Sequence, residues 1–256
     1  MDLSIVIVNY KSQDKLRRLL ASLRAADFSG IQSEIIVVEN NSGDDLGDLE
    51  ALAKVIKSPR NLGMGGGNNL GISQSQGEYV AIMNPDTLVK ADSLKILYNY
   101  IKQHPEVGLV GPKLVYPDGS LQYSCSRFPG FWIPILRRTF LGDYFRQVRD
   151  SFMMLDFNHD LISEVDWLMG SCLMFKRDLR FDERYFMYFE DTDLARQVRS
   201  RGLKVIYNPE AVVVHDHQRA SAELPWYQAI FKSRLAWLHI LSWWKYFLKW
   251  GLKSKI

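Results

Sequence analysis

The chain lacks the features that mark several common protein classes. Among its 256 residues are only two cysteines, Cys125 and Cys172, which lie far apart and form no CxxC pair. This excludes a dense disulfide framework and a cysteine zinc site, and it favours buried free thiols in a reducing compartment. The first residues contain no basic segment, so we expect no signal peptide. No run of about 18 apolar residues occurs, so we expect no membrane-spanning helix.

The glycine-rich stretch 63–71 lacks the spacings of the common phosphate-binding loops. It contains no Gly-x-Gly-x-x-Gly after a strand and no Gly-Lys-Ser/Thr. Two interpretations stay open: a backbone that approaches a ligand closely, and a loosely packed start of a helix.

Charge is unevenly distributed along the chain. Residues 221–256 hold six Lys/Arg, one acidic residue and five of the seven tryptophans, whereas residues 1–220 hold 26 basic and 28 acidic residues. A basic and aromatic segment is typical of a helix that lies on anionic lipid. A helix that packs against a domain or a partner is the alternative, and no nucleic-acid-binding module is recognisable.

Apolar strands alternate with helical segments along the first half of the chain. Strands are expected at residues 3–10, 34–39, 54–57, 79–83 and 107–110, and helices at 11–25, 64–76 and 91–103. Ser12 is the expected cap of the first helix. Because the strands are fully apolar and alternate with helices, we expect a mostly parallel sheet covered on both faces.

The second half has a less regular pattern. We expect a hairpin at 114–122 around a Pro-Asp-Gly turn, a helix at 191–201 ended by Gly202, and final strands at 203–207 and 211–214. Residues 123–160 mix aromatic residues with short apolar runs of no clear period. They are interpreted as an insertion that packs beside the sheet.

Three of the expected strands end in polar clusters. These are Asn9-Tyr10, Glu39-Asn40 and Asn84-Pro85-Asp86. Because parallel strands end at the same edge of a sheet, we expect the three clusters to lie together, where open α/β sheets bind ligands. The alternative for Asn84 and Asp86 is a plain turn.

An acidic cluster, Glu190, Asp191 and Asp193, stands at the expected start of a helix, directly after the aromatic run 185–189. Helix capping explains one or two of these acids, and Asp193 is expected to support the helix start. Carboxyls placed behind an apolar wall also have the raised pKa of a general base. His215, at the end of a strand, suits either a structural role or a divalent ion held together with an aspartate.

Seven motifs occur in a recognisable order. They are residues 5–10, residues 37–42, Asn61-Leu62-Gly63 with Asn68, residues 83–86, Trp167 with Gly170-Ser171, residues 186–193, and His215. In this order, over residues 3–220, the chain resembles family 2 glycosyltransferases, and most closely their rhamnosyltransferase-like bacterial branch.

The resemblance implies a GT-A fold, a Rossmann-like α/β/α sandwich, over residues 1–220. It implies a nucleotide-binding half at about 1–110 and an acceptor half at about 111–220, followed by an amphipathic helical tail at 221–256. The implied activity is inverting transfer of a sugar, with L-rhamnose from dTDP-L-rhamnose as the first expectation and a UDP-hexose as the alternative. The implied acceptor is a polyprenyl-diphosphate-linked or growing polysaccharide glycan.

The resemblance also assigns roles to single residues. It implies Asp191 as general base beside Glu190, a divalent ion (Mg²⁺ or Mn²⁺) on Asp86 and His215, and acceptor contacts from Trp167, Gly170 and Glu190. The donor site implied by the resemblance comprises Asn9, Tyr10, Glu39, Asn61, Gly63, Asn68, Asn84 and Asp86. Arg127 and Arg219 are candidate helpers for the leaving diphosphate.

Two positions depart from the family pattern. Asn84 stands where the first acid of an Asp-x-Asp motif is usual, which puts the strength of metal binding in doubt. Glu39 stands where an aspartate is more usual, which leaves the choice of base open.

The sequence does not favour two other function classes. A sugar nucleotidyltransferase would carry a Gly-rich, Arg/Lys-bearing loop after its first strand, which Asn9-Tyr10-Lys11-Ser12 does not provide. A non-catalytic, membrane-associated nucleotide-sugar-binding protein would not need the Glu190-Asp191 pair. We therefore expect an enzyme. The resemblance to enzymes that use polyprenyl-diphosphate-linked acceptors, together with the basic and aromatic tail, implies a cytoplasmic location, peripheral on the cytoplasmic face of the inner membrane, and the oligomeric state is left open.

Overall fold

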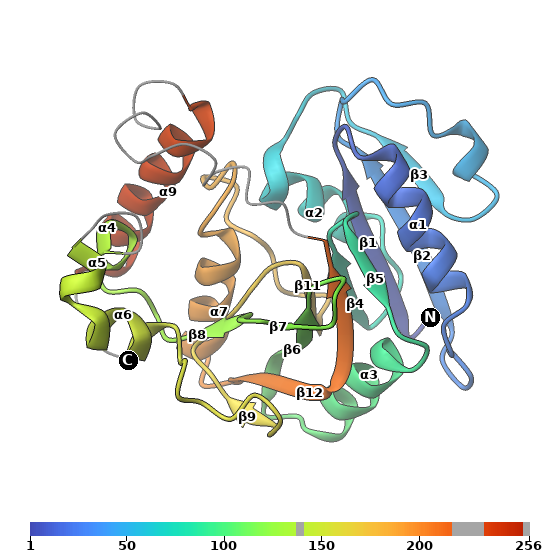
Figure 1. The fold of residues 1–256 in the computed structure, drawn as a ribbon. Helices are drawn as coiled ribbons and strands as arrows, with labels where there is room; N and C mark the ends of the chain where they lie inside the picture. The colour runs from blue at the N-terminus through green and yellow to red at the C-terminus, as the bar shows by residue number, and fades with distance from the viewer. Residues whose placement is uncertain (137–140, 217–232, 253–256) are drawn as a thin grey trace.

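A mixed sheet forms the centre of the computed structural model, which describes residues 1–136, 141–216 and 233–252 (Figure 1). Its main strands follow the order β3 (Lys54–Lys57), β2 (Ser33–Glu39), β1 (Leu3–Asn9), β4 (Tyr79–Met83), β11 (Cys172–Lys176), β6 (Val107–Val115), β12 (Lys204–His215) and β5 (Thr87–Val89). The short strands β7 (Leu121–Gln122) and β9 (Ser163–Glu164) pair with β6 and β12. A separate two-stranded sheet joins β8 (Cys125–Ser126) and β10 (Trp167–Leu168).

The strands of the main path are mostly parallel. β1 runs parallel to both β2 and β4, and β6 runs parallel to β12, whereas β11 is antiparallel to both of its neighbours and β5 is antiparallel to β12. β6 crosses residue 110, so the two expected halves of the domain share one sheet.

Helices cover both faces of this sheet, as predicted. α1 (Gln13–Arg24) and α3 (Ser93–Gln103) pack on one face, where Leu3, Ile5 and Ile7 of β1 point. α2 (Gly63–Ser73) and α7 (Glu190–Ser200) pack on the other, with Val6 of the same strand. This alternation follows from the two-residue period of a strand. The result is an α/β/α sandwich.

The glycine-rich stretch is a helix packed tightly on the sheet. A Cβ atom on Gly71 would lie only 2.3 Å from Cγ1 of Val6, so the helix approaches the strand at a distance that no larger residue allows. The expectation of a loosely packed helix start is therefore wrong, because a Cβ on Gly63 would also lie only 2.1 Å from the Phe186 carbonyl oxygen; a close approach of this backbone to a ligand stays a prediction.

Four local expectations were wrong. The two final strands form the single strand β12, which continues past an irregularity between Asn208 and Val212. β5 was not foreseen. The hydroxyl of Ser12 donates to the carbonyl of Tyr10 and does not cap α1. The helix expected at 64–76 is α2, which ends at Ser73.

The region 123–160 and the end of the chain lie together at one side of the sandwich (Figure 1). The insertion forms α4 (Ile133–Leu136), α5 (Leu141–Tyr144) and α6 (Arg146–Phe152), and the tail forms α9 (Arg234–Trp250). An aromatic cluster joins them to the segment before α7: Tyr185, Phe189, Trp243, Tyr246 and Phe247, with Phe131 and Ile135. Among the described residues, no helix has the length and apolar character needed to cross a membrane.

Candidate active site

The polar ends of three parallel strands meet at one edge of the sheet, as predicted. Asn9 lies opposite Glu39 in the pairing of β1 and β2. β4 runs beside β1 in the same direction and ends at Met83, so Asn84 and Asp86 follow at this edge. The arrangement is that of an open α/β sheet, whose ligands bind beyond the strand ends.

Some of the predicted donor residues are held by their own neighbours. The buried Asn9 donates through Nδ2 to Oδ2 of Asp44 at 2.8 Å, while its Oδ1 has no hydrogen-bond partner. The Glu39 carboxylate accepts the backbone N–H of Ser42 at 2.6 Å and so closes the loop after its strand. Tyr10 is exposed. A contact of Glu39 with a nucleoside stays a prediction.

Asn40 organises the loop that precedes α2. Its Oδ1 accepts the N–H of Leu62 at 2.9 Å, and its Nδ2 donates to the carbonyl of Gly63 at 3.1 Å and to Oδ1 of Asn61 at 3.2 Å. Asn68 is buried on α2. The predicted donor residues Asn61 and Gly63 are thereby brought to the end of β2 by Asn40, which was expected in the polar cluster there but was given no role of its own.

Asp86 and His215 face each other where β4 and β12 end. Nε2 of His215 lies 3.4 Å from Oδ1 of Asp86, and Nδ1 lies 2.8 Å from Oε1 of Gln122. Ser171 Oγ approaches the same ring to 3.3 Å. Burial by itself raises the pKa of Asp86, but the hydrogen bond and charge of His215, together with the charge of Lys15, outweigh it and lower the pKa. Asp86 is therefore ionised at neutral pH.

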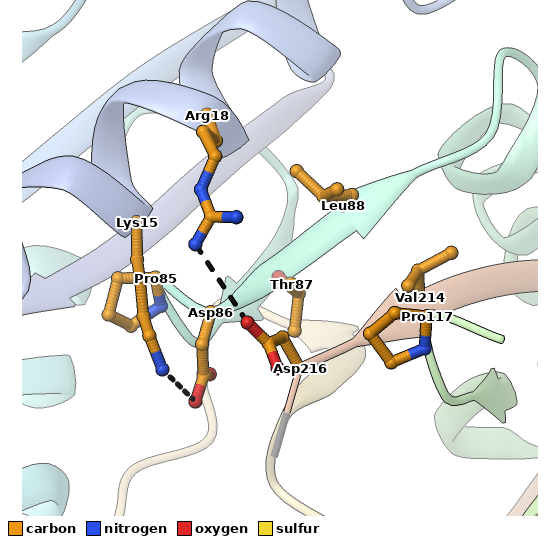
Figure 2. Close-up of a pocket in the computed structure, with 9 residues that line it drawn as sticks. All are labelled: Lys15, Arg18, Pro85, Asp86, Thr87, Leu88, Pro117, Val214 and Asp216. Atoms are coloured by element: carbon orange, nitrogen blue, oxygen red, sulfur yellow. Dashed lines mark ion pairs between the residues drawn. The ribbon is translucent and has the colours of Figure 1, made fainter. Parts of the chain in front are cut away.

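A small pocket of about 140 Å³ opens beside Asp86 (Figure 2). Two cations of α1 point into it: Lys15 Nζ lies 3.9 Å from Oδ2 of Asp86, and Arg18 Nη2 lies 3.9 Å from Oδ2 of Asp216. Pro85, Thr87, Leu88, Pro117 and Val214 complete its lining. Carboxylates and cations in one pocket suit a phosphate group that binds together with a metal ion.

Lys15 and Arg18 were missed by the sequence reasoning. Their spacing places both on one side of α1, but only the fold shows that this side lies over Asp86. The helper residues expected instead are placed differently: Arg127 is exposed, and Arg219 lies outside the described residues.

Asp86 and His215 fit part of a site for a divalent ion. A carboxylate oxygen and an imidazole nitrogen are accepted by Mg²⁺ and Mn²⁺, and Gln122 holds Nδ1 of the histidine so that Nε2 is directed at Asp86. Within the described ranges, no group of three or more His, Cys, Asp or Glu side chains is arranged for an ion. An ion held here would therefore need further ligands from a bound diphosphate and water, because Asn84 supplies only a neutral amide.

Glu190 and Asp191 open α7 after a strained turn. Tyr188 and Phe189 both have left-handed backbone conformations, with φ of 69° and 64°, which cost non-glycine residues about 1–3 kcal/mol each. Oε2 of Glu190 is buried without a hydrogen-bond partner. Burial, followed by the charge of Asp191, raises the pKa of Glu190 to about 8, and burial raises the pKa of Asp191. The direction of these pKa shifts is the one predicted, and burial is their main cause.

Asp191 is oriented by backbone and hydroxyl donors. Its Oδ2 accepts the N–H of Gly170 at 2.9 Å, and its Oδ1 accepts the N–H and hydroxyl of Thr192 at 2.7 and 3.2 Å. The Trp167 indole lies close enough to lower the pKa of Asp191, yet its Nε1 has no partner within hydrogen-bond distance. Two of the three residues expected to contact the acceptor, Trp167 and Gly170, therefore border the predicted base, and the third, Glu190, precedes it in the chain.

Two consecutive residues connect the predicted base with the histidine. The Gly170 N–H binds Asp191, Ser171 Oγ lies 3.3 Å from Nδ1 of His215, and the Ser171 carbonyl accepts the N–H of Asn84 at 2.9 Å. The predicted base Asp191 and one of the two predicted metal ligands, His215, thus contact adjacent residues of one dipeptide.

Asp193 has a different role from the one expected. It is fully buried, and its carboxylate accepts hydrogen bonds from Nζ of Lys249 at 2.8 Å and from Nε1 of Trp250 at 2.7 Å. The side chain of Asp193, three residues after Glu190, therefore anchors α9 to α7. Only the backbone N–H of Asp193, which donates to the Phe189 carbonyl, belongs to the helix start.

Comparison with known proteins agrees with this architecture. The family model described as glycosyl transferase family 2 matches residues 4–160. An N-acetylglucosaminyl-diphospho-decaprenol L-rhamnosyltransferase of Mycobacterium tuberculosis is 27% identical over 281 residues, with 99% of this chain and 90% of that protein covered. The rhamnosyltransferase WbbL of Escherichia coli is 24% identical, with 82% of each chain covered.

Among solved structures, GalNAc-T7 with UDP, GalNAc and Mn²⁺ superposes with a TM-score of 0.67 at 15% identity. The match covers 86% of this chain but only 44% of that one, and at this identity it shows the fold alone. The mostly parallel sheet between two layers of helices is thus the GT-A fold, as expected. Since the family model covers more than half of its residues, the chain belongs to glycosyl transferase family 2.

Proposed function

We propose that the protein is an inverting glycosyltransferase that moves L-rhamnose from dTDP-L-rhamnose to a lipid-linked or growing polysaccharide glycan. The observation that supports the proposal is the dipeptide Gly170-Ser171: Gly170 binds Asp191 of the half-buried acid pair, and Ser171 contacts His215, which faces Asp86 at the sheet edge. An inverting transfer needs one base on the acceptor side and one cationic site on the leaving-group side. The names of the two rhamnosyltransferase relatives support the choice of sugar.

The leaving group is assigned to the pocket beside Asp86. Lys15 and Arg18 would bind the diphosphate oxygens as the bond to the sugar breaks. Asp86 and His215 would hold a divalent ion, which when bound neutralises the negative charge that develops on the nucleoside diphosphate. The Mn²⁺ bound to GalNAc-T7 supports this assignment only through the shared fold.

The attacking group is assigned to the acid pair. Asp191 would take the proton of an acceptor hydroxyl while that oxygen attacks the anomeric carbon, and the electrons of the broken bond leave with the diphosphate. A raised pKa makes this carboxylate a stronger base, and the N–H of Gly170 fixes its direction. Glu190, with an unpartnered buried oxygen, would hold the acceptor hydroxyl.

The test of the base is the substitution Asp191→Asn. Turnover of dTDP-L-rhamnose, followed by release of dTDP, should fall roughly 10²- to 10⁴-fold, since that is the usual contribution of a general base. Binding of dTDP by calorimetry should stay nearly unchanged. Asp178→Asn, at an exposed acid, is the matched control. Wild-type turnover in the Asp191 variant would rule out this residue as the base.

The test of the donor is a panel of nucleotide-sugars in a thermal-shift assay. Stabilisation by dTDP-L-rhamnose above all UDP-sugars supports the proposal, whereas preference for a UDP-hexose would replace rhamnose as the donor. In the same assay, Asp86→Ala should weaken both the donor shift and its response to Mg²⁺ or Mn²⁺. An unchanged metal response would remove Asp86 from the metal site.

We also propose that the enzyme works at the cytoplasmic face of the inner membrane without spanning it. A diphospho-decaprenol acceptor, as in the name of the mycobacterial relative, resides in a membrane, so the enzyme must reach its surface. The basic and aromatic tail is consistent with this placement.

A further inference from the structure

Helix α9 presents apolar side chains on two opposite sides. Its inner side packs Ala236, Trp243, Tyr246 and Phe247 against the rest of the protein, where they are buried. Its outer side exposes Trp237, Leu241, Trp244 and Leu248, followed by Leu252 just past the helix end. These five positions are three or four residues apart and so form one continuous stripe. A surface helix that only packs on its own domain needs a single apolar face, so the outer stripe needs another explanation.

The insertion extends this exposed apolar surface. The ring of Phe131 lies 5.7 Å from that of Trp244, and Nε1 of Trp243 donates to the Phe131 carbonyl at 3.1 Å, so the insertion and α9 are in contact. The insertion exposes Trp132, Leu141, Tyr144, Phe145 and Val148, with Tyr144 83% exposed. Together, residues 131–152 and 237–252 hold ten of the sixteen exposed large hydrophobic side chains among the described residues. Such concentration marks an interaction surface.

The same two segments of the sequence carry a net positive charge. Residues 131–152, the part of the insertion that carries the five exposed side chains named above, hold four arginines and two acids, a net charge of +2, and the whole insertion 123–160 has a net charge of +1. Residues 221–256 hold six basic residues and one acid, a net charge of +5. The rest of the chain has 22 basic and 26 acidic residues, a net charge of −4, which gives the total of +3. The apolar surface therefore lies on two segments of net positive charge, in a chain whose remaining residues are net acidic.

We infer that the outer side of α9 and the exposed side chains of the insertion form one docking surface for an anionic phospholipid bilayer. Trp and Tyr side chains suit the boundary between headgroups and acyl chains, and a helix of this kind lies in the plane of the membrane. Each Lys or Arg near an anionic surface adds to the attraction. The surface extends beyond the tail, because the insertion supplies half of its apolar side chains.

This inference depends on the proposed function in one respect only: the proposed acceptor is linked to a lipid, and such a lipid resides in a membrane. A partner protein or a second copy of the chain could also cover an apolar stripe. The excess of positive charge favours lipid, because the cores of protein interfaces are depleted of charge.

The experiment is sedimentation of the full chain with vesicles. One set contains phosphatidylcholine alone, and the other contains equal parts of phosphatidylcholine and phosphatidylglycerol. Wild type should bind the anionic vesicles about tenfold or more better than the neutral ones, because several basic residues contribute. The double variant Trp244→Glu/Leu248→Glu should lose about tenfold or more of this binding, since two apolar side chains are replaced by acids.

Two further variants make the test specific. The matched control, Leu52→Glu/Leu161→Glu, changes two exposed leucines outside the surface and should bind like wild type. Trp132→Ser/Tyr144→Ser should lower binding about threefold or more, since both side chains would leave the interface. Wild-type binding by this last variant would restrict the surface to α9.

Two results would overturn the inference. One is equal binding of wild type and the α9 variant to anionic vesicles. The other is a lipid-free dimer that the α9 variant makes monomeric, because the stripe would then be an interface between copies. Thermal midpoints near that of wild type verify folding, and turnover of a water-soluble acceptor separates the two proposals. Vesicle binding without sugar transfer would contradict the proposed function but would still support the proposed docking surface.

Discussion

Replacing Lys249 by methionine tests whether α9 is an integral part of the catalytic domain. Nζ of this lysine lies 2.7 Å from Oδ1 of Asp193 and 2.8 Å from Oδ2 of Asp182. Asp193 has no exposed side-chain surface, whereas Lys249 is 22% exposed. Methionine keeps the length and apolar part of the lysine but removes its charge, so the variant leaves a buried carboxylate without its cation.

The cost follows from the partners that Asp193 retains. Removing one member of a buried ion pair costs about 3–5 kcal/mol. Here the carboxylate keeps hydrogen bonds from Tyr185, Gln197 and Trp250, so we expect a loss near the lower limit, about 3 kcal/mol. For a protein of this size that corresponds to a fall of about 6–12 °C in melting temperature.

Urea unfolding followed by tryptophan fluorescence measures this loss. The control Lys204→Met breaks a half-exposed ion pair with Glu106, and it should change the free energy of unfolding by no more than about 1 kcal/mol. The double variant Asp193→Asn/Lys249→Met has no unpaired buried charge and should recover at least half of the loss. A Lys249 variant with the wild-type midpoint, or a double variant no more stable than the single one, would refute the reasoning.

Three further predictions concern the site. Gly170→Ala should lower the turnover number and leave nucleotide binding intact. A Cβ at this position would lie 3.3 Å from Oδ2 of Asp191 and would change the orientation of that carboxylate. Steady-state kinetics measures the effect. Glu190→Gln should weaken the pH dependence of stability. The pKa of Glu190 is about 8 in the folded state and 4.5 ordinarily, so between these pH values the folded wild type holds a proton that the unfolded chain has lost. The free energy of unfolding of wild type therefore falls as the pH rises from 4.5 to 8, and urea titrations across that range measure the fall. Lys15→Met should raise the KM for the nucleotide-sugar about tenfold or more, since a charge-assisted contact is lost, whereas Arg24→Met, at an exposed position of the same helix, should not.

Much of the fold could be predicted because many segments carry their own pattern. The strand Lys54–Lys57 has the predicted bounds, the Pro-Asp-Gly turn places Leu114 opposite Gln122, and Gly202 ends α7 with a φ of 75°. In each case the local residues determine the conformation, through apolar runs, turn preference or the left-handed tolerance of glycine.

The remaining features depend on partners far away in sequence. β5, a strand of three residues, exists because β12 pairs with it. Asp193 was taken for a helix-start residue because its cation, Lys249, comes 56 positions later. Gln122, which holds His215, lies 93 positions before it on a short edge strand. No local sequence pattern predicts such long-range contacts, so the roles of these residues follow only from the fold.

The Gly170-Ser171 dipeptide has a consequence for how the site responds to change. One peptide unit, with a fixed spacing of about 3.8 Å between its Cα atoms, separates the contact to Asp191 from the contact to His215. Covalent geometry thus sets the distance between the Cα atoms of the two contacting residues, while the contact to His215 itself is made by the side-chain hydroxyl of Ser171. Substitutions at Asp191 and His215 should therefore be non-additive although the two side chains are not bonded to each other, and a double-mutant cycle on turnover would measure that coupling.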